Sequence, residues 1–448
     1  MPALRLPPVA VPWRPALDPR RRGPALTVAR EVVARATDPE RIALGLAAAR
    51  RQTRYPQTLR RTPYSLAAGD AGLAALCAAA DADLPGEGWD AAAHGFLAAA
   101  ARAAERAPVL PWGLFEGLGG LAFATMLLSR GGARYRTLLA TLDAALARPA
   151  AAFVATGDGG RPGPTTAFDL VSGAAGVGAY LLTRDPHGLL PGILRGLVAL
   201  ARPAGGLPGW WTPPAPTDDG FTARAYPHGS LNCGLAHGVP GPLALLALAL
   251  RAGAEVPGQH DAVQVMAAWL VAQHTEDRWG VNWPAAVPVP PPGTPWPQPA
   301  GLEPARAAWC YGSPGVARAL WLAGCALDDA DLRDLAVEAI RAALRRPVSE
   351  RRIDSPTFCH GVAGLLQIVL RFWQDTRLPV LSQAAAGLVD QLLAVYQPER
   401  PFGFAALEPG GNPVDRGGLL DGAPGVALAL LAAATPADPS WDRLFLLA

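Results

Sequence analysis

The segment WCYGSPGVARAL, residues 309–320, joins a short turn to an apolar helix through a Gly-x-x-Gly unit that begins at Gly312. The same arrangement occurs seven times in the chain of 448 residues. The units begin 48 to 74 residues apart, at Gly69, Gly117, Gly173, Gly238, Gly312, Gly361 and Gly422. Such an interval has room for two helices and their connections, so the sequence predicts one repeated helical unit per copy.

The residues around each glycine pair indicate two kinds of helix. Two glycines at this spacing permit a tight turn and a close approach of the backbone. The helix that follows is apolar nearly all round, which is typical of a helix buried on every side. Segments 331–346 and 381–396, which lie between units, are amphipathic and belong on an outer surface. We therefore predict an all-α fold, an α/α toroid or double-layer barrel of seven inner and seven outer helices, with the glycine turns at one rim.

The chain is expected to form a flexible N-terminal tail, residues 1–26, and a single toroid domain, residues 27–448, whose first helix begins near Thr27. Three long segments without a helical pattern interrupt the repeat, at residues 205–229, 279–304 and 402–418. Loops of this length are usually functional or disordered. We expect them to frame a cleft beside the turns.

Composition excludes several classes of protein. The formal net charge of +2 is too small to indicate a nucleic-acid partner. No apolar run reaches the ~18–20 residues that span a bilayer, and the N-terminus lacks a secretory pattern. Five cysteines, an odd number, do not form a disulfide framework. These features predict a cytoplasmic protein with no transmembrane segment, which reaches a membrane only through partners.

Two consecutive turns carry residues that bind metals. Cys310 lies two residues before Gly312, and Cys359 and His360 directly precede Gly361. The two cysteines are 49 residues apart, which is one repeat, so the three side chains are expected to converge. Two thiolates and one imidazole suit zinc, and three protein ligands are typical of a catalytic zinc with an open position. Without the repeat, buried structural cysteines would be the better interpretation.

Other candidates for chemistry lie near the same turns. His237 precedes Gly238 and suits acid–base work near neutral pH, although a core histidine or a helix cap is an alternative. Asp169 could orient His237 or cap a helix. Arg306 lies four residues before Cys310 and would share a face with it in a helix, or else be an ordinary surface arginine. Cys233 is a weaker candidate for a fourth metal ligand.

At these residues the sequence resembles the class I lanthipeptide cyclases, the LanC family. The matching strings are FDLVSGAAGVGAYLL, LNCGLAHGVPGPLALL, RAAWCYGSPGVARAL, FCHGVAGLL and GLLDGAPGVALALL. The resemblance implies a toroid with a central zinc bound by Cys310, Cys359 and His360. It also implies that His237, Asp169, Arg306 and Tyr311 are active-site residues.

The implied reaction adds a peptide cysteine thiol to dehydroalanine or dehydrobutyrine, which closes a thioether ring. The implied partners are a dehydrated precursor peptide, a lanthipeptide dehydratase and an exporter. A protein prenyltransferase also activates a peptide thiol with zinc, whereas a glycosidase needs paired carboxylates that these turns do not offer. A non-catalytic zinc protein that binds thiol compounds or scaffolds a biosynthetic complex is the remaining alternative.

Overall fold

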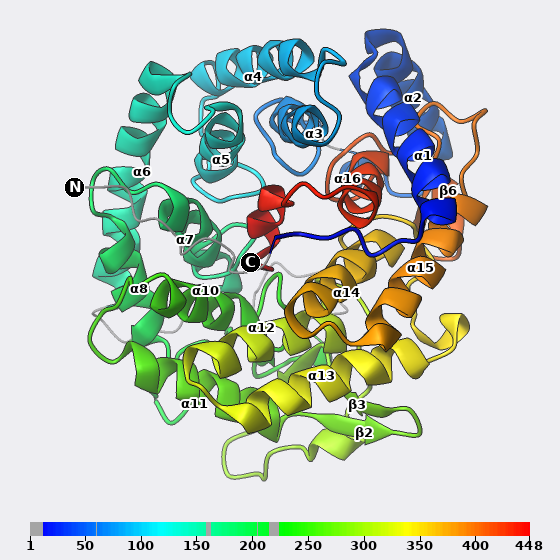
Figure 1. Cartoon of the computed structure of the whole chain (residues 1–448). Helices are drawn as coiled ribbons and strands as arrows, with labels where there is room; N and C mark the ends of the chain where they lie inside the picture. Colours follow the sequence, from blue (N-terminus) through cyan, green and yellow to red (C-terminus); the bar gives the residue numbers. More distant parts are fainter. Residues whose placement is uncertain (1–11, 60, 158–162, 204, 215–223) are drawn as a thin grey trace. The chain divides into compact units, whose positions relative to one another are not determined.

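The computed structural model describes residues 12–59, 61–157, 163–203, 205–214 and 224–448. Each of the seven glycine units begins a helix, as the sequence predicts (Figure 1). We call these the core helices: α3 (Asp70–Asp83), α5 (Leu118–Leu128), α7 (Ala174–Thr183), α10 (Pro240–Arg251), α12 (Ser313–Ala326), α14 (Val362–Thr376) and α16 (Ala423–Ala434). Their burial confirms the second part of the prediction, since every residue of α16 is buried.

Amphipathic helices alternate with the core helices along the chain, and we call them the covering helices. They are α1 (Pro19–Thr37), α4 (Trp89–Glu105), α6 (Arg136–Gly157), α8 (Leu190–Ala199), α11 (Gln259–Ala272), α13 (Ala330–Arg345) and α15 (Pro379–Ala394). In α13, the buried residues include Leu332, Ala336 and Ile340, on the face expected from the sequence. A further helix, α2 (Pro39–Gln52), follows α1.

The described strands are short and form antiparallel pairs. The pairs are β1 (Ser230–Asn232) with β4 (Ala286–Pro288), β2 (Thr275–Asp277) with β3 (Gly280–Asn282), and β5 (Ala406–Glu408) with β6 (Asn412–Val414). The 3₁₀ turns are η1 (Pro56–Thr58), η2 (Thr165–Ala167), η3 (Pro299–Gly301), η4 (Val348–Glu350) and η5 (Ser440–Phe445). Of these strands and turns, β3, β4 and η3 lie in the segment 279–304, and β5 and β6 lie in the segment 402–418, two of the segments that carried no helical pattern.

The chain divides into two compact units. Unit 1 contains Asp143–Pro347 and Leu444–Ala448, and unit 2 contains Val9–Leu142 and Val348–Arg443. In unit 1 the core helices α7, α10 and α12 pack in a row, and α8, α11 and α13 cover them. In unit 2 the row is α14, α16, α3 and α5, covered by α15, α1 and α4. The expectation of a single domain stays a prediction.

Close backbone contacts explain the glycine pairs. A Cβ atom on Gly312 would lie 1.7 Å from the carbonyl oxygen of Arg306, and one on Gly315 would lie 2.3 Å from that of Trp309. Gly312 also has φ of +101°, a conformation that side chains disfavour. In both contacts the carbonyl belongs to the residue six positions earlier, so the preceding loop folds back over the start of the helix. The same spacing recurs at Gly117, Gly238, Gly361 and Gly422.

Backbone hydrogen bonds link successive turns at one repeated position, two residues before the first glycine. In unit 2 the Cys359 N–H donates to the Leu420 oxygen at 3.0 Å, and the Leu420 N–H donates to the Ala67 oxygen at 3.0 Å. In unit 1 the Ala236 N–H donates to the Cys310 oxygen at 3.3 Å. Cys310 and Cys359 therefore occupy the same position in their own repeats, as the sequence register predicts.

The N-terminal segment differs from the expected tail. Residues 1–11 lie outside the described residues, but α1 begins at Pro19 rather than near Thr27. Asp18 caps this helix, and proline is well tolerated in the first turn because its missing N–H is not needed there. Trp13 is buried and donates its indole N–H to the Ala432 oxygen at 2.9 Å. The expectation of a tail is thus wrong for residues 12–26, which pack within unit 2.

One helix is long and apolar enough to cross a membrane by length and composition, namely Arg136–Ala155 within α6. Only 28% of this segment is buried. Its buried residues, which include Leu139, Leu142 and Leu146, recur every three or four positions, and alanine fills most exposed positions. This pattern is that of an amphipathic covering helix. A single such helix is weak evidence for a membrane span.

Candidate functional site

The polar candidates stand at one position of the repeat, directly before the first glycine of a unit. His237, Tyr311 and His360 occupy this position ahead of α10, α12 and α14. Asp421 occupies it ahead of α16. Because the loop folds back over each helix start, this position is fixed by the backbone rather than by side-chain packing alone.

His237 and Asp169 form a direct pair in unit 1. The Nδ1 atom of His237 lies 2.7 Å from Oδ2 of Asp169, whose side chain is fully buried. The other carboxylate oxygen accepts the N–H groups of Ser172 at 2.7 Å and Gly173 at 2.9 Å. Asp169 therefore contacts His237 and holds the turn before α7, but it does not cap that helix, whose N-cap residue is Gly173. The His237 side chain is 38% exposed.

Tyr311 lies against the same pair. Its ring centroid is 6.3 Å from that of His237, and its hydroxyl accepts a hydrogen bond from the Asn232 amide at 3.1 Å. Gly234 makes room for Tyr311, because a Cβ there would lie 2.6 Å from the tyrosine ring.

Arg306 is exposed and lies in a loop, because α12 begins only at Ser313. The helical face considered for Arg306 and Cys310 is therefore wrong. Its backbone carbonyl faces Gly312, as described above. Among the residues that the structure describes, no hydrogen bond or ion pair engages the guanidinium group of Arg306, which leaves it accessible on the surface of unit 1.

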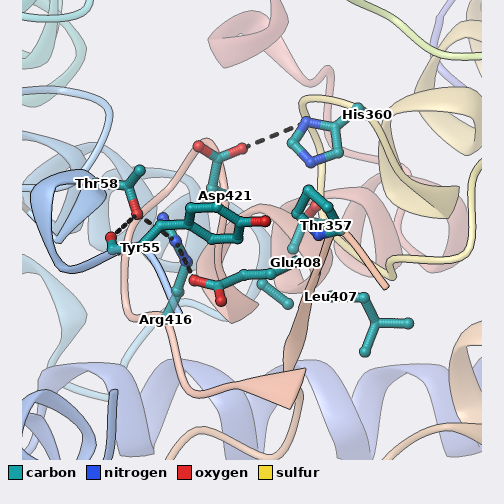
Figure 2. Close-up of a pocket in the computed structure, with 10 residues that line it drawn as sticks. Tyr55, Thr58, Thr357, His360, Leu407, Glu408, Arg416 and Asp421 are labelled. Carbon is teal, nitrogen blue, oxygen red and sulfur yellow. Dashed lines mark hydrogen bonds and ion pairs between the residues drawn. The ribbon is translucent and has the colours of Figure 1, made fainter. Parts of the chain in front are cut away.

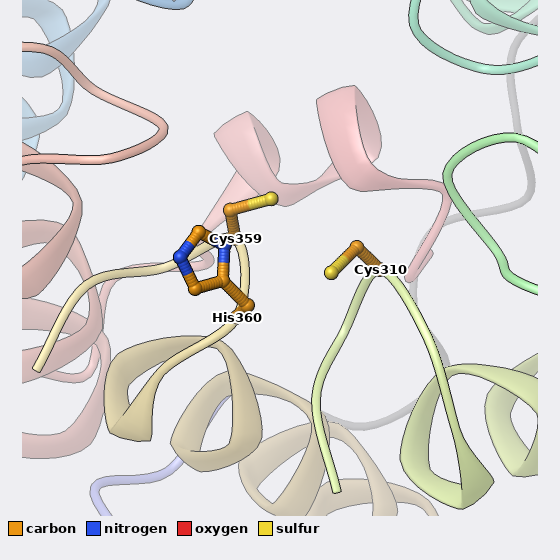
Figure 3. Close-up of side chains that lie close together, drawn as sticks. All are labelled: Cys310, Cys359 and His360. Atoms are coloured by element: carbon orange, nitrogen blue, oxygen red, sulfur yellow. The ribbon is translucent and has the colours of Figure 1, made fainter. Parts of the chain in front are cut away.

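Cys310, Cys359 and His360 are residues that could hold a metal ion, and each offers one ligand atom. Figure 3 draws Cys310 on the loop ahead of α12, and Cys359 with His360 on the loop ahead of α14. Cys310 is buried, and Cys359 is partly exposed. The donor set of two thiols and one imidazole is the type that zinc prefers.

Cys77 and Cys233 are different from these ligands. Both are buried, and burial raises the pKa of the Cys77 thiol to about 12 and that of the Cys233 thiol still further. Cys233 directs its sulfur to the Leu231 oxygen at 3.8 Å. Cys77 is thus a core residue, and the structure gives no support to Cys233 as a fourth ligand.

A pocket of about 340 Å³ lies in unit 2, with His360 in its wall (Figure 2). Part of the predicted loop 402–418 lines it, as expected for a segment that frames a cleft. The lining residues are Tyr55, Thr58, Thr357, His360, Ala406, Leu407, Glu408, Pro409, Arg416 and Asp421. Residues far apart in the sequence thus meet around one histidine of the candidate metal set.

The sequence profile described as "Lanthionine synthetase C-like protein" matches residues 60–446, which is most of the chain. The chain belongs to the lanthionine synthetase C-like family. It is 26% identical over 225 residues to the nisin biosynthesis protein NisC of Lactococcus lactis subsp. lactis, an alignment that covers 46% of this chain and 49% of NisC. The chain therefore spans about half the length of this curated relative.

The solved structure of a nisin cyclase resembles this lanthionine synthetase C-like chain, with a TM-score of 0.69 and 21% sequence identity. The match covers 91% of this chain and 97% of the other. This likeness confirms the predicted fold class, an all-α toroid with two layers of helices. The family membership suggested by the strings around Cys310 and Cys359 is confirmed as well.

The lanthionine synthetase C-like chain also has site residues that the sequence analysis missed. Asp421, Arg416 and Glu408 line the pocket beside His360 but were not among the candidates. Asp421 could have been found, because it occupies the same repeat position as His237 and His360. Arg416 and Glu408 lie in the segment 402–418, outside the repeat, and no sequence pattern marks them as site residues.

Glu408 anchors the pocket wall and should contribute to stability. Burial alone would raise the pKa of Glu408, but hydrogen bonds from Thr53, Arg54, Asn412 and Arg416 outweigh it and lower the pKa to about 2. We expect Glu408→Gln to lose about 2 kcal/mol of unfolding free energy at neutral pH, since hydrogen bonds to a buried charge are lost. Urea denaturation at pH 7 measures this difference.

The pH dependence of this effect has a defined sign. Since the folded-state pKa of Glu408 lies below the ordinary glutamate value, the ionised form stabilises the fold above about pH 4.5. This contribution is lost as the pH falls toward about 2. The gap between wild type and Glu408→Gln should therefore narrow over that range, and a gap that stays constant would contradict the assignment.

Proposed function

We propose that this chain is a zinc-dependent lanthipeptide cyclase, which adds peptide cysteine thiols to dehydroalanine or dehydrobutyrine and so forms lanthionine or methyllanthionine rings. One observation carries the proposal: Cys310 and Cys359 occupy equivalent positions of two consecutive repeats, with His360 next to Cys359. The Cys310 turn accepts a hydrogen bond from the turn that carries His237, which pairs with Asp169. Family membership supports the same chemistry.

Cys310, Cys359 and His360 would hold the zinc ion. The residues fit the metal in ligand type, and their register places them at matching points of successive turns. Zinc with three protein ligands keeps an open position, and the cation favours the thiolate form of a thiol that enters it. The reaction also requires proton transfer and binding of the peptide, and side chains of the protein would provide both.

His237 is the proposed acid and base. In its neutral form, an Nδ1–H donated to the Asp169 carboxylate leaves Nε2 as the free basic nitrogen. Nε2 accepts the proton of the substrate thiol. The sulfur then bonds to the β-carbon, the alkene electrons move to form an enolate, and the α-carbon takes a proton from the imidazolium. Atoms balance, so the peptide mass does not change.

Tyr311 and Arg306 are proposed to assist at the enolate. Tyr311 lies beside His237, and its hydroxyl accepts a hydrogen bond from the Asn232 amide. A phenolic hydroxyl is also a donor by type. Arg306 offers an accessible guanidinium on the loop that leads to Cys310. Donors aimed at an oxygen that gains charge stabilise it in the transition state.

The direct test uses a synthetic peptide with one cysteine and one dehydroalanine. The zinc-loaded protein is expected to remove the free thiol, measured by alkylation, with no change in peptide mass. A protein that binds one equivalent of zinc and the peptide, yet leaves the thiol free, would support the alternative of a non-catalytic thiol-binding or scaffold protein. Transfer of a prenyl group would add mass and identify a prenyltransferase.

The same proposal defines the surroundings of the enzyme. Its substrate would be a dehydrated precursor peptide, so a lanthipeptide dehydratase must supply the alkene. We propose that it works in the cytoplasm, with an exporter as a further partner and peripheral contact to the membrane through that complex. Co-purification of the chain with a tagged dehydratase tests this part of the proposal separately.

A further inference from the structure

The pocket beside His360 has a buried acceptor atom that receives no hydrogen bond from the residues that the structure describes. The Oδ1 atom of Asp421 is buried and has no hydrogen-bond partner among the described residues. Nδ1 of His360 lies 3.8 Å from it, which is within reach of an ion pair but too long for a hydrogen bond, and the Asp421 side chain as a whole is 41% exposed (Figure 2). A buried acceptor without a donor costs free energy, and each such group in a folded protein needs an explanation.

Arg416 supplies unused donors on another part of the lining. One of its terminal nitrogens, Nη2, donates to Thr58 at 2.8 Å and to Glu408 at 3.1 Å. These two bonds fix the guanidinium, while its other N–H groups engage no partner among the residues that the structure describes. Glu408 itself is saturated, because Thr53, Arg54 and Asn412 also donate to it.

The rest of the lining is half hydroxyl-bearing, from Tyr55, Thr58 and Thr357, and half apolar, from one strand and its turn. Ala406, Leu407 and Pro409 lie on or beside β5. A volume of about 340 Å³ is at the small end of the range for ligand pockets, roughly 300–1,000 Å³. The pocket thus offers one acceptor, several donors and an apolar surface in a space suited to a short segment of peptide.

We propose that this pocket binds the backbone of the substrate peptide next to the reacting cysteine. The Asp421 carboxylate accepts a peptide N–H, and Arg416 donates to a peptide carbonyl. This inference rests on the proposed function, because His360 in the pocket wall is what places the bound segment beside the thiol. Contacts to the backbone of the substrate peptide do not distinguish one side chain from another. The pocket therefore accepts different residues beside the substrate cysteine.

Turn geometry supports a fixed position for Asp421. The Cys359 N–H donates to the Leu420 oxygen at 3.0 Å, which joins the turns that carry His360 and Asp421. The two side chains therefore lie next to each other because their backbones are linked. A substrate N–H that reaches Asp421 would have its cysteine within reach of the His360 turn.

The experiment combines a backbone change in the peptide with a change in the protein. The probe is the synthetic peptide with one cysteine and one dehydroalanine, made with and without an N-methyl group on the amides flanking the cysteine. In the wild type, N-methylation at one of these amides should lower kcat/KM by about 10- to 100-fold, as expected for a hydrogen bond to a charged group. In Asp421→Ala the unmodified peptide should already show this loss, and N-methylation should cost less than about twofold.

The control is Asp328→Ala, since Asp328 has a side chain that is 97% exposed and lies outside the pocket. This variant should respond to N-methylation as the wild type does. Equal sensitivity of wild type and Asp421→Ala to every N-methyl group would overturn the inference. So would loss of zinc from Asp421→Ala, because the aspartate would then act through His360 and not on the peptide.

Failure of the proposed function gives a different result. If no protein cyclises the peptide, the same comparison is made by fluorescence anisotropy with a labelled peptide. Weaker binding of the N-methylated peptide to wild type but not to Asp421→Ala would keep the pocket as a peptide site without cyclase activity. If the methylated and unmethylated peptides bound wild type and Asp421→Ala with the same affinity, both the peptide site and the cyclase function would be rejected.

Discussion

Cys359→Ala is expected to lose its zinc and to lower cyclisation of the synthetic peptide by more than about 100-fold. The expectation follows from removing one of three proposed ligands, since even the outer partners of a metal site are worth about 10- to 100-fold in metal affinity or activity. Alanine keeps the N–H that donates to the Leu420 oxygen, so the turn before α14 should stay in place. Zinc content is measured by mass spectrometry of the purified protein, and activity by thiol alkylation.

Cys325→Ala is the matched control, because Cys325 is a partly exposed thiol within α12 and not on a turn. It should bind zinc and cyclise the peptide as the wild type does. Circular dichroism of both variants shows whether the helices are intact. If Cys359→Ala or Cys310→Ala held one equivalent of zinc and cyclised normally, the metal would have no part in the reaction as proposed.

The core helices could be predicted because each one is determined locally. A glycine pair, the carbonyl six residues earlier and an apolar run specify the start of α12, and the same elements recur at α14 and α16. The pairing of His237 with Asp169 was also within reach, because both residues precede core helices of neighbouring repeats. Where the repeat determines the path of the backbone, the sequence is sufficient to predict the local structure.

Features outside the repeat were harder to predict. The start of α1 was placed too late, because its arginines and prolines gave the composition of a tail although Asp18 caps a helix. Arg306 was considered on a helix that begins only at Ser313. The pocket brings together residues as distant as Tyr55 and Asp421, and only long-range packing creates it.

His237→Ala is expected to lower kcat by about 10²- to 10⁴-fold, the range for a positioned acid or base. Its zinc content should be unchanged, because His237 is not one of the proposed ligands. Its unchanged zinc content distinguishes His237→Ala from Cys359→Ala, which is expected to lose both zinc and activity. Single-turnover measurements with the synthetic peptide give the rate, and full activity of His237→Ala would remove this residue from the mechanism without affecting the metal site.

Asp169→Asn tests how the histidine is oriented, because it divides the two roles of the carboxylate. The asparagine oxygen can still accept the N–H groups of Ser172 and Gly173, so the turn before α7 should hold. Its amide N–H₂ would then face Nδ1 of His237, where the carboxylate oxygen now lies at 2.7 Å. A donor at that place requires Nδ1 to be the unprotonated nitrogen, which moves the proton to Nε2 and leaves no base toward the substrate. We therefore expect Asp169→Asn to fold with an unchanged Tm, bind zinc and lose about as much activity as His237→Ala, whereas a near-normal rate would show that the tautomer does not matter.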